Sequence, residues 1–155
     1  MERDYEDEFL IRAENGYLHL KIENVIGFPH KLCSWGGYDT KSAIEIISSG
    51  CSVKGEIYIS TGIIYNFYVK LKDCYEKLTG EARLVSYEEN FKINAIFDRQ
   101  GHIKIQGIFQ EFRYGNNELK FELHTDQTYL FQTIVMLESI YEKYGDNKGI
   151  TGKNI

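Results

Sequence analysis

The sequence contains a single proline and no apolar run long enough to cross a membrane. Its longest apolar stretch, residues 63–71, includes Asn66 and Lys70. A membrane-spanning helix needs about 20 consecutive apolar residues, so no such helix is expected. The first residues are acidic, whereas a secretory signal peptide begins with basic ones. We therefore expect a soluble protein that is not exported and does not bind a membrane.

Cysteine is also scarce. Cys33, Cys51 and Cys74 are odd in number and form no Cys-x-x-Cys pair. A disulfide framework is therefore not expected, because such frameworks use paired cysteines in secreted chains. Three free thiols are typical of a reducing cytosol, and the predicted location is cytoplasmic.

Positive charge is the third deficit. The formal net charge is −5 at pH 7, with Lys and Arg outnumbered by Asp and Glu. A protein that binds DNA or RNA normally presents a basic face, so direct binding to nucleic acid is disfavoured. An acidic chain can instead associate rapidly with a basic protein. That class of partner stays open.

Aromatic residues are abundant, with twelve tyrosines and nine phenylalanines, and such residues favour half-buried sheet surfaces. Asn15-Gly16 predicts a hairpin turn, and Gly55 predicts a bulge within its strand. Apolar and polar residues alternate in eight segments, which predicts strands around residues 9–12, 17–25, 43–47, 53–59, 82–85, 91–97, 103–109 and 118–124.

Two further segments carry apolar residues at helical spacing, and each follows a strand. Ser60 or Thr61 can cap the first helix, and Thr125 or Asp126 can cap the second, because their side chains accept free backbone N–H groups. Gly80 and Gly145 mark the ends. The predicted fold class is α+β, in the order ββββα-ββββα.

We expect one domain, residues 8–145, with both helices on one face of a curved, mostly antiparallel sheet of about eight strands. Residues 1–7 are expected to be flexible and residues 146–155 disordered. The halves 8–80 and 81–145 have the same order of elements. An internal duplication explains this, and so does the periodicity that any strand-to-helix unit needs on a sheet.

A search for catalytic groups finds none of the common phosphate-binding, zinc-protease or serine-hydrolase motifs. His30 and Cys33 have a spacing that metal sites use, but no second pair of ligands follows. Gly36-Gly37 is interpreted as a tight turn rather than an anion site, and Asp126 as a helix cap rather than a catalytic acid. The predicted protein is not an enzyme and binds no metal or cofactor.

Exposed tyrosine and tryptophan are favoured residues at protein interfaces. Several tyrosines, Tyr58 and Tyr87 among them, fall in turns or on the polar side of a strand. Trp35 and Tyr38, with Asp39 beside them, occupy a predicted loop, although Trp35 can equally close one end of the core. Carboxylates also fall in predicted turns. The candidate partner-binding residues are Trp35, Tyr38, Asp39, Glu88, Glu89 and Asp98.

Four groups of residues, in this order, resemble the WapI-like immunity proteins of bacterial toxin–immunity systems. They are Pro29 and Trp35; Leu78-x-Gly80-x-Ala82-x-Leu84; Gly101-His102-Ile103-x-Ile105-x-Gly107; and Leu119-x-Phe121-x-Leu123-x-x-Asp126-Gln127-Thr128-x-Leu130. The resemblance covers most of the domain, from about residue 8 to residue 144, and residues 27–42 fit it least well.

This resemblance implies a small protein of contact-dependent growth-inhibition or related systems that binds the C-terminal domain of a cognate toxin. Such toxins are often nucleases, frequently acting on RNA, and an acidic inhibitor suits their basic clefts. We expect a monomer or a weak dimer. Two alternatives stay open: a small-molecule-binding or adaptor domain, and an unrecognised hydrolase that uses a residue near a helix start, such as Asp126.

Overall fold

The computed structural model describes residues 7–111 and 117–150, and its first half is a four-stranded antiparallel sheet. The two-residue turn after Ala13 joins the first pair of strands, as Asn15-Gly16 predicts. The register slips once, between Ile22 and Asn24. The strands, in sheet order, are β1 (Glu8–Ala13), β2 (Gly16–Ile26), β3 (Asp39–Ser48) and β4 (Cys51–Ser60).

Helix α1 (Thr61–Lys77) follows, and the same scheme is then repeated. A second antiparallel sheet contains β5 (Gly80–Val85), β6 (Phe91–Phe97), β7 (His102–Gln110) and β8 (Glu118–Asp126), again in sequence order. Helix α2 (Gln127–Tyr144) completes the fold. The predicted α+β class and the order ββββα-ββββα are confirmed.

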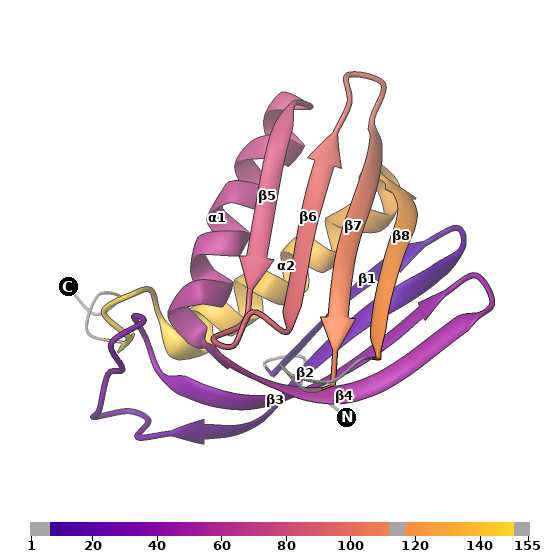
Figure 1. Ribbon diagram of the computed structural model, residues 1–155. Helices are drawn as coiled ribbons and strands as arrows, with labels where there is room; N and C mark the ends of the chain where they lie inside the picture. The colour runs from indigo at the N-terminus through magenta and orange to yellow at the C-terminus, as the bar shows by residue number, and fades with distance from the viewer. Residues whose placement is uncertain (1–6, 112–116, 151–155) are drawn as a thin grey trace, which may run out of the picture.

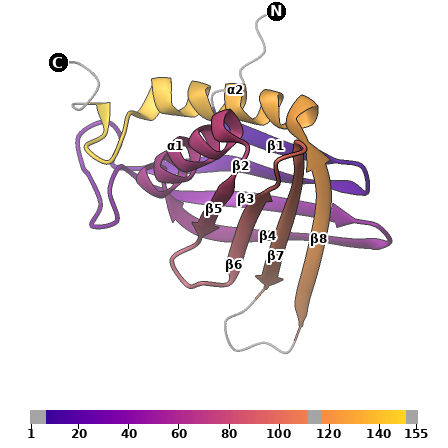
Figure 2. The ribbon, with the colours of Figure 1, turned by 90° about the horizontal axis from the view of Figure 1, so that it is seen from above.

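The eight strands divide between two sheets rather than forming one continuous curved sheet. Helix α1 separates β4 from β5, and β5 is an edge strand of a second sheet, where it is hydrogen-bonded to β6. Figures 1 and 2 show the strands of the second sheet running steeply across those of the first, with both helices on the same side of the molecule.

Each sheet buries one face, and the buried residues of both sheets and both helices form a single hydrophobic core. The alternating burial of β3 and β6 reflects the alternating sequence pattern. Gly55 lies where the sheets meet: a Cβ there would come within 2.3 Å of Cζ of Phe109. The predicted bulge at Gly55 is wrong, because β3 and β4 pair without a slip, and the residue is small to admit this ring.

Both helices begin as predicted. The side chain of Ser60 accepts the N–H of Ile63 at 3.0 Å, and that of Asp126 accepts the N–H of Tyr129 at 3.1 Å. Each helix packs against the first strand of the opposite half, α1 against β5 and α2 against β1. The two helices also pack against each other. None of the described helices is long and apolar enough to span a membrane.

The two predicted flexible ends are partly described. Asp7 pairs with Lys143 at 3.1 Å and accepts a hydrogen bond from Tyr144. Residues 146–150, which were expected to be disordered, pack against the loop after β2: the N–H of Gly37 donates to the carbonyl of Asn147 at 2.8 Å. Residues 1–6 and 151–155, and residues 112–116 between β7 and β8, lie outside the described residues.

Candidate interaction surface

The loop 27–38 between β2 and β3 is fixed at its far end by close backbone contacts. Gly36 and Gly37 have φ angles of +93° and +69°, which confirms the predicted turn. Gly36 accepts the N–H of Gly62 at 3.2 Å, at the start of α1. A Cβ on Gly37 would lie 2.3 Å from Oγ1 of Thr61. The loop therefore holds one defined position over the helix N-terminus.

Trp35 projects from this loop and is 55% exposed. Its ring stacks on that of Tyr87, with centroids 5.0 Å apart and planes 20° from parallel. Tyr87 lies in the turn between β5 and β6, so the stack joins the two halves of the molecule. A stacked tryptophan loses little freedom on binding, because its ring orientation is already set.

The hydroxyl of Tyr87 donates a hydrogen bond to the carboxylate of Asp39. Sγ of Cys33 lies 3.6 Å from the same hydroxyl. Burial, followed by the hydrogen bond to Asp39, raises the pKa of Tyr87 well above its ordinary value. The hydroxyl therefore keeps its proton at physiological pH and holds the Asp39 carboxylate against the same tyrosine that stacks on Trp35.

Glu88 and Glu89 are exposed in the same turn as Tyr87. The turn is held from below, where the buried Ser86 hydroxyl lies 2.8 Å from Oδ1 of Asn90. The N–H of Tyr87 also donates to the carbonyl of Tyr58 at 3.0 Å, which brings the half-exposed Tyr58 side chain of β4 beside the turn. We call this region the Trp35 surface; it consists of Trp35, Asp39, Tyr58, Tyr87, Glu88 and Glu89.

The Trp35 surface combines an exposed aromatic ring with carboxylates. A shallow cavity of about 370 Å³ opens beside Trp35 and is also lined by Ile26 and Leu32, whose side chains are about half exposed. Rings of this kind attract lysine and arginine side chains through the electrons of their faces, and neighbouring carboxylates add to that attraction. Such a surface suits a basic protein partner.

Tyr38 does not belong to this surface, which corrects the sequence-based assignment. Its side chain is fully buried. Its hydroxyl donates to the carbonyl of Pro29 at 3.0 Å and accepts the N–H of Ile150 at 3.2 Å. The ring packs edge-to-face against Phe28. Tyr38 therefore holds the loop onto the body of the protein and is not available to a partner.

Asp98 is also separated from the other candidates. It lies in the turn between β6 and β7, at the opposite end of the second sheet from Glu88 (Figure 1). Its carboxylate accepts the N–H groups of Gln100 and His102 at 2.8 and 3.0 Å. Desolvation raises the pKa of Asp98, but these N–H groups and the His102 side chain together outweigh it, so the pKa lies below its ordinary value. Asp98 closes its own turn.

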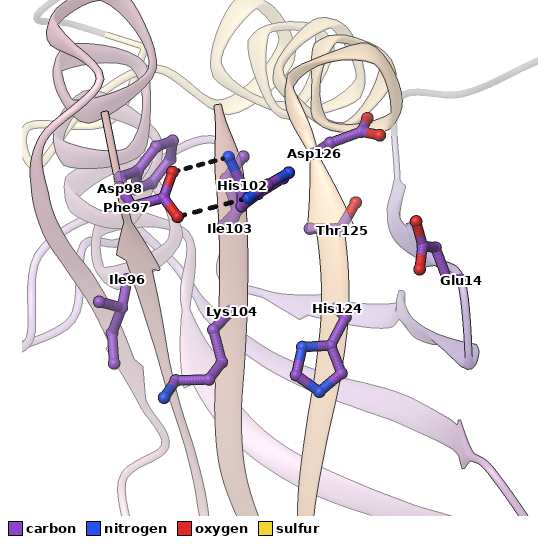
Figure 3. A pocket seen from close by; sticks show the side chains of 10 residues that line it. All are labelled: Glu14, Ile96, Phe97, Asp98, His102, Ile103, Lys104, His124, Thr125 and Asp126. Atoms are coloured by element: carbon purple, nitrogen blue, oxygen red, sulfur yellow. Dashed lines mark hydrogen bonds and ion pairs between the residues drawn. The ribbon is translucent and has the colours of Figure 1, made fainter. Parts of the chain in front are cut away.

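Figure 3 shows the hollow of about 570 Å³ beside Asp98. Asp98 and His102 point toward each other, with Oδ2 and Nδ1 3.5 Å apart, and His124 and Lys104 lie lower on neighbouring strands. The His102 side chain is 70% exposed. An exposed histidine–carboxylate pair of this kind is typical of a solvated turn and contributes little energy.

Asp126 lines the same hollow, and its carboxylate caps α2, as the sequence predicts. Within residues 7–111 and 117–150, no group of three or more His, Cys, Asp or Glu side chains is placed to hold a metal ion. His30 and Cys33 lie on the loop 27–38, where Cys33 is engaged with Tyr87. The side chains that line this hollow therefore give no reason to prefer it to the Trp35 surface as the functional site.

Tyr87 and Tyr58 are the components that sequence reasoning did not assign to the site. Their placement in a turn and on the polar side of a strand was the available signal. That signal was shared with several other tyrosines, and the stack with Trp35 depends on a contact between distant parts of the chain.

The fold and its surface define an α+β protein with an exposed aromatic and acidic patch. A model of the Immunity protein WapI-like family matches residues 9–145. The chain belongs to this family, and membership supports a role as an immunity protein. No curated protein matches the sequence.

Proposed function

We propose that this chain neutralises a bacterial toxin by binding the toxin's C-terminal domain stoichiometrically, without catalysing a reaction. Family membership supports the immunity role. The observation that carries the choice of surface is the exposed Trp35 ring, stacked on Tyr87 and bordered by Asp39, Glu88 and Glu89. Exposed, preorganised aromatic residues are frequent binding hot spots.

The proposed toxin domain is a nuclease with a basic substrate cleft, and RNase activity is the first to be tested. The net charge of −5 and the carboxylates of the Trp35 surface are complementary to such a cleft. Complementary charges speed association and discriminate against acidic partners. The proposed location is the cytoplasm, where all three free cysteines would remain reduced.

The test uses the C-terminal domain of any large protein that a neighbouring gene encodes. Binding is measured by calorimetry, and neutralisation by growth of cells that express the toxin domain with or without this chain. We expect a dissociation constant in the nanomolar range, about that of other tight complexes with standard interfaces, together with rescue of growth. Absence of both binding and rescue would contradict the proposed function.

The contact surface is tested by the double substitution of Glu88→Lys and Glu89→Lys. We expect about tenfold weaker binding and a smaller dependence of the association rate on salt, because charges at an interface mainly steer encounter. The matched control is the double substitution of Glu138→Lys and Glu142→Lys, two exposed glutamates on α2. Equal effects of the two charge reversals would place the interface elsewhere.

A second candidate function rests on a cavity of about 660 Å³ between β1, β2 and α2. Its lining includes Arg12, Tyr17 and Tyr129, and its volume falls in the range of small-molecule sites. A ligand that binds only the native state raises the melting temperature. A screen of metabolites by thermal shift, repeated with Tyr129→Ala, would favour this function if one compound stabilised only the parent protein.

A further inference from the structure

The two sheets have four edge strands, and three of them make contacts that cover part of the edge. Helix α2 packs along β1, where Oγ1 of Thr133 donates to the carbonyl of Leu10 at 2.7 Å. Helix α1 packs along β5. The turn between β1 and β2 meets β8, where the N–H of Glu14 donates to the carbonyl of His124 at 2.9 Å. The fourth edge strand is β4.

The direction of the backbone groups along β4 follows from its hairpin. Only Ser49 and Gly50 separate β3 from β4, so Ser48 and Cys51 form the hydrogen-bonded pair that closes the turn. Backbone groups of alternate residues point to opposite sides of a strand. The odd-numbered residues of β4 therefore bond to β3, and the even-numbered ones point away. The carbonyl of Tyr58 agrees with this, because it accepts the N–H of Tyr87.

Beyond Tyr58 the edge is open. In the part of the chain that the structure describes, no hydrogen bond reaches the outward backbone groups of Ser52, Lys54 and Glu56. The side chains of Lys54 and Glu56 pair across the outer face of the sheet with Glu45 and Lys41, at 3.3 and 3.5 Å. Figure 2 shows β4 on the side of its sheet that faces away from α2. An unpaired edge of this kind is a template for another strand.

We propose that the toxin domain adds an extended, basic segment to the free edge of β4, running from Tyr58 toward Cys51. This inference rests on the proposed function and specifies how the partner is held. The edge continues the Trp35 surface, since Tyr58 belongs to both. Backbone hydrogen bonds would supply affinity along the strand, and the Trp35 surface would supply selectivity at one end.

Charge favours a basic segment over a second copy of this chain. A groove of about 300 Å³ runs beside the edge, and the described residues that line it include Glu56, Glu88 and Glu111 and no lysine or arginine. Lysine or arginine side chains of an added strand would meet these carboxylates. A second copy paired edge to edge would instead bring its own Glu56 and Glu88 toward the same groove, where like charges repel.

Hydrogen exchange tests the proposal directly. In the free protein, the outward amides of Ser52, Lys54 and Glu56 should exchange much faster than the inward amides of Val53 and Gly55. Addition of the toxin domain from the neighbouring gene should slow the outward set by at least about tenfold, because each amide gains a partner. Unchanged exchange at these three amides in a complex that forms would overturn strand addition.

A pair of substitutions at one position gives a second test. Lys54→Pro removes an outward N–H, which an edge strand tolerates without loss of its own pairing. Lys54→Ala removes the same side chain and keeps the N–H. We expect the proline variant to bind the toxin domain at least about tenfold more weakly than the alanine variant. Equal binding by the two folded variants would overturn the proposal.

The outcomes separate the two levels of inference. Suppose the toxin domain binds tightly, Lys54→Pro does not weaken binding, and exchange at the β4 edge stays unchanged in the complex. The proposed function would then stand, and strand addition would be contradicted. Failure of the parent protein to bind or rescue would remove both. Concentration-dependent dimerisation of the free protein, abolished by Lys54→Pro in sedimentation, would assign the edge to a second copy and also overturn the proposal. If the proline variant unfolds, the exchange experiment alone decides.

Discussion

The loop 27–38 and the turn Asp98–Gly101 occupy equivalent places in the two halves, because each joins the second strand of its sheet to the third. The turn is closed by one carboxylate, that of Asp98. The loop is long, carries the exposed ring of Trp35, and is anchored to α1 and to Asn147. The same position in the scaffold thus serves as a simple connection in one half and as a candidate recognition element in the other.

This difference shows where the two halves diverge. Their strand order, helix caps and reciprocal helix packing agree, as both an internal duplication of residues 8–80 and 81–145 and a shared packing requirement predict. A loop on a rigid scaffold can change without loss of the core, and binding residues concentrate on such loops. The loop also lies in the region that resembles the family pattern least, as expected for a segment that fits a particular toxin.

The largest effect is expected on stability, from Gly37→Ala in the loop. A Cβ there would lie 2.3 Å from Oγ1 of Thr61, at a φ of +69°, so we expect a loss of about 3 kcal/mol or more in the free energy of unfolding. Gly101→Ala meets only the flexible Gln127 side chain at 3.0 Å and should cost about 1–2 kcal/mol.

Gly50→Ala is the control, because nothing lies within 4 Å of its Cβ position. It should change stability by about 0.5 kcal/mol or less. Urea denaturation of the three variants measures the series. A Gly37→Ala protein as stable as Gly50→Ala would show that the loop is not held by these contacts.

The next effect is on binding. Trp35→Ala should weaken toxin binding by about 2–4 kcal/mol, the loss typical of a central aromatic hot spot, while the stack with Tyr87 contributes at most about 1.5 kcal/mol to stability. Phe131→Ala removes an aromatic ring that is 59% exposed on α2, in the other half. Calorimetry should show the control within about twofold of the parent protein. If Trp35→Ala and Phe131→Ala weakened binding equally, the loop 27–38 would not be a special recognition element.

The smallest effect is expected from Asp98→Asn in the tight turn. The neutral side chain accepts hydrogen bonds less strongly than the exposed carboxylate, so the free energy of unfolding should fall only slightly. Toxin binding should be unchanged, since Asp98 lies at the far end of the second sheet from the Trp35 surface. Weaker binding by a fully folded Asp98→Asn protein would show that this turn contributes to the interface after all.

Local sequence patterns predicted the elements well, because alternation and capping are local properties. Ser60 and Asp126 cap their helices, and the Asn15-Gly16 turn forms where expected. The division into two sheets was not predicted. It depends on how α1 redirects the chain and on the close approach of Phe109 to Gly55, and neither depends on neighbours in sequence.

The site was predicted only in part for the same reason. Trp35, Glu88 and Glu89 are exposed, as expected of loop residues. Tyr38 has the same local character as Trp35 but is buried by Phe28 and by residues after α2. Tyr87 is brought to Trp35 from the other half of the chain. Which turn meets which loop is decided by tertiary packing, and a single sequence carries no local sign of it.

The exchange of helices between the halves has a consequence for synthesis on the ribosome. Of the described elements, β1 is synthesised first and α2, the helix that packs against it, is synthesised last. Asp7 likewise gains its contacts with Lys143 and Tyr144 only after α2 has been synthesised. Contacts between the first strand and the last helix of a domain favour late, cooperative folding over stepwise folding. A nascent chain that stops before α2 cannot complete the part of the fold that supports the Trp35 surface. We therefore expect the proposed toxin neutralisation to begin only when nearly the whole domain has been translated.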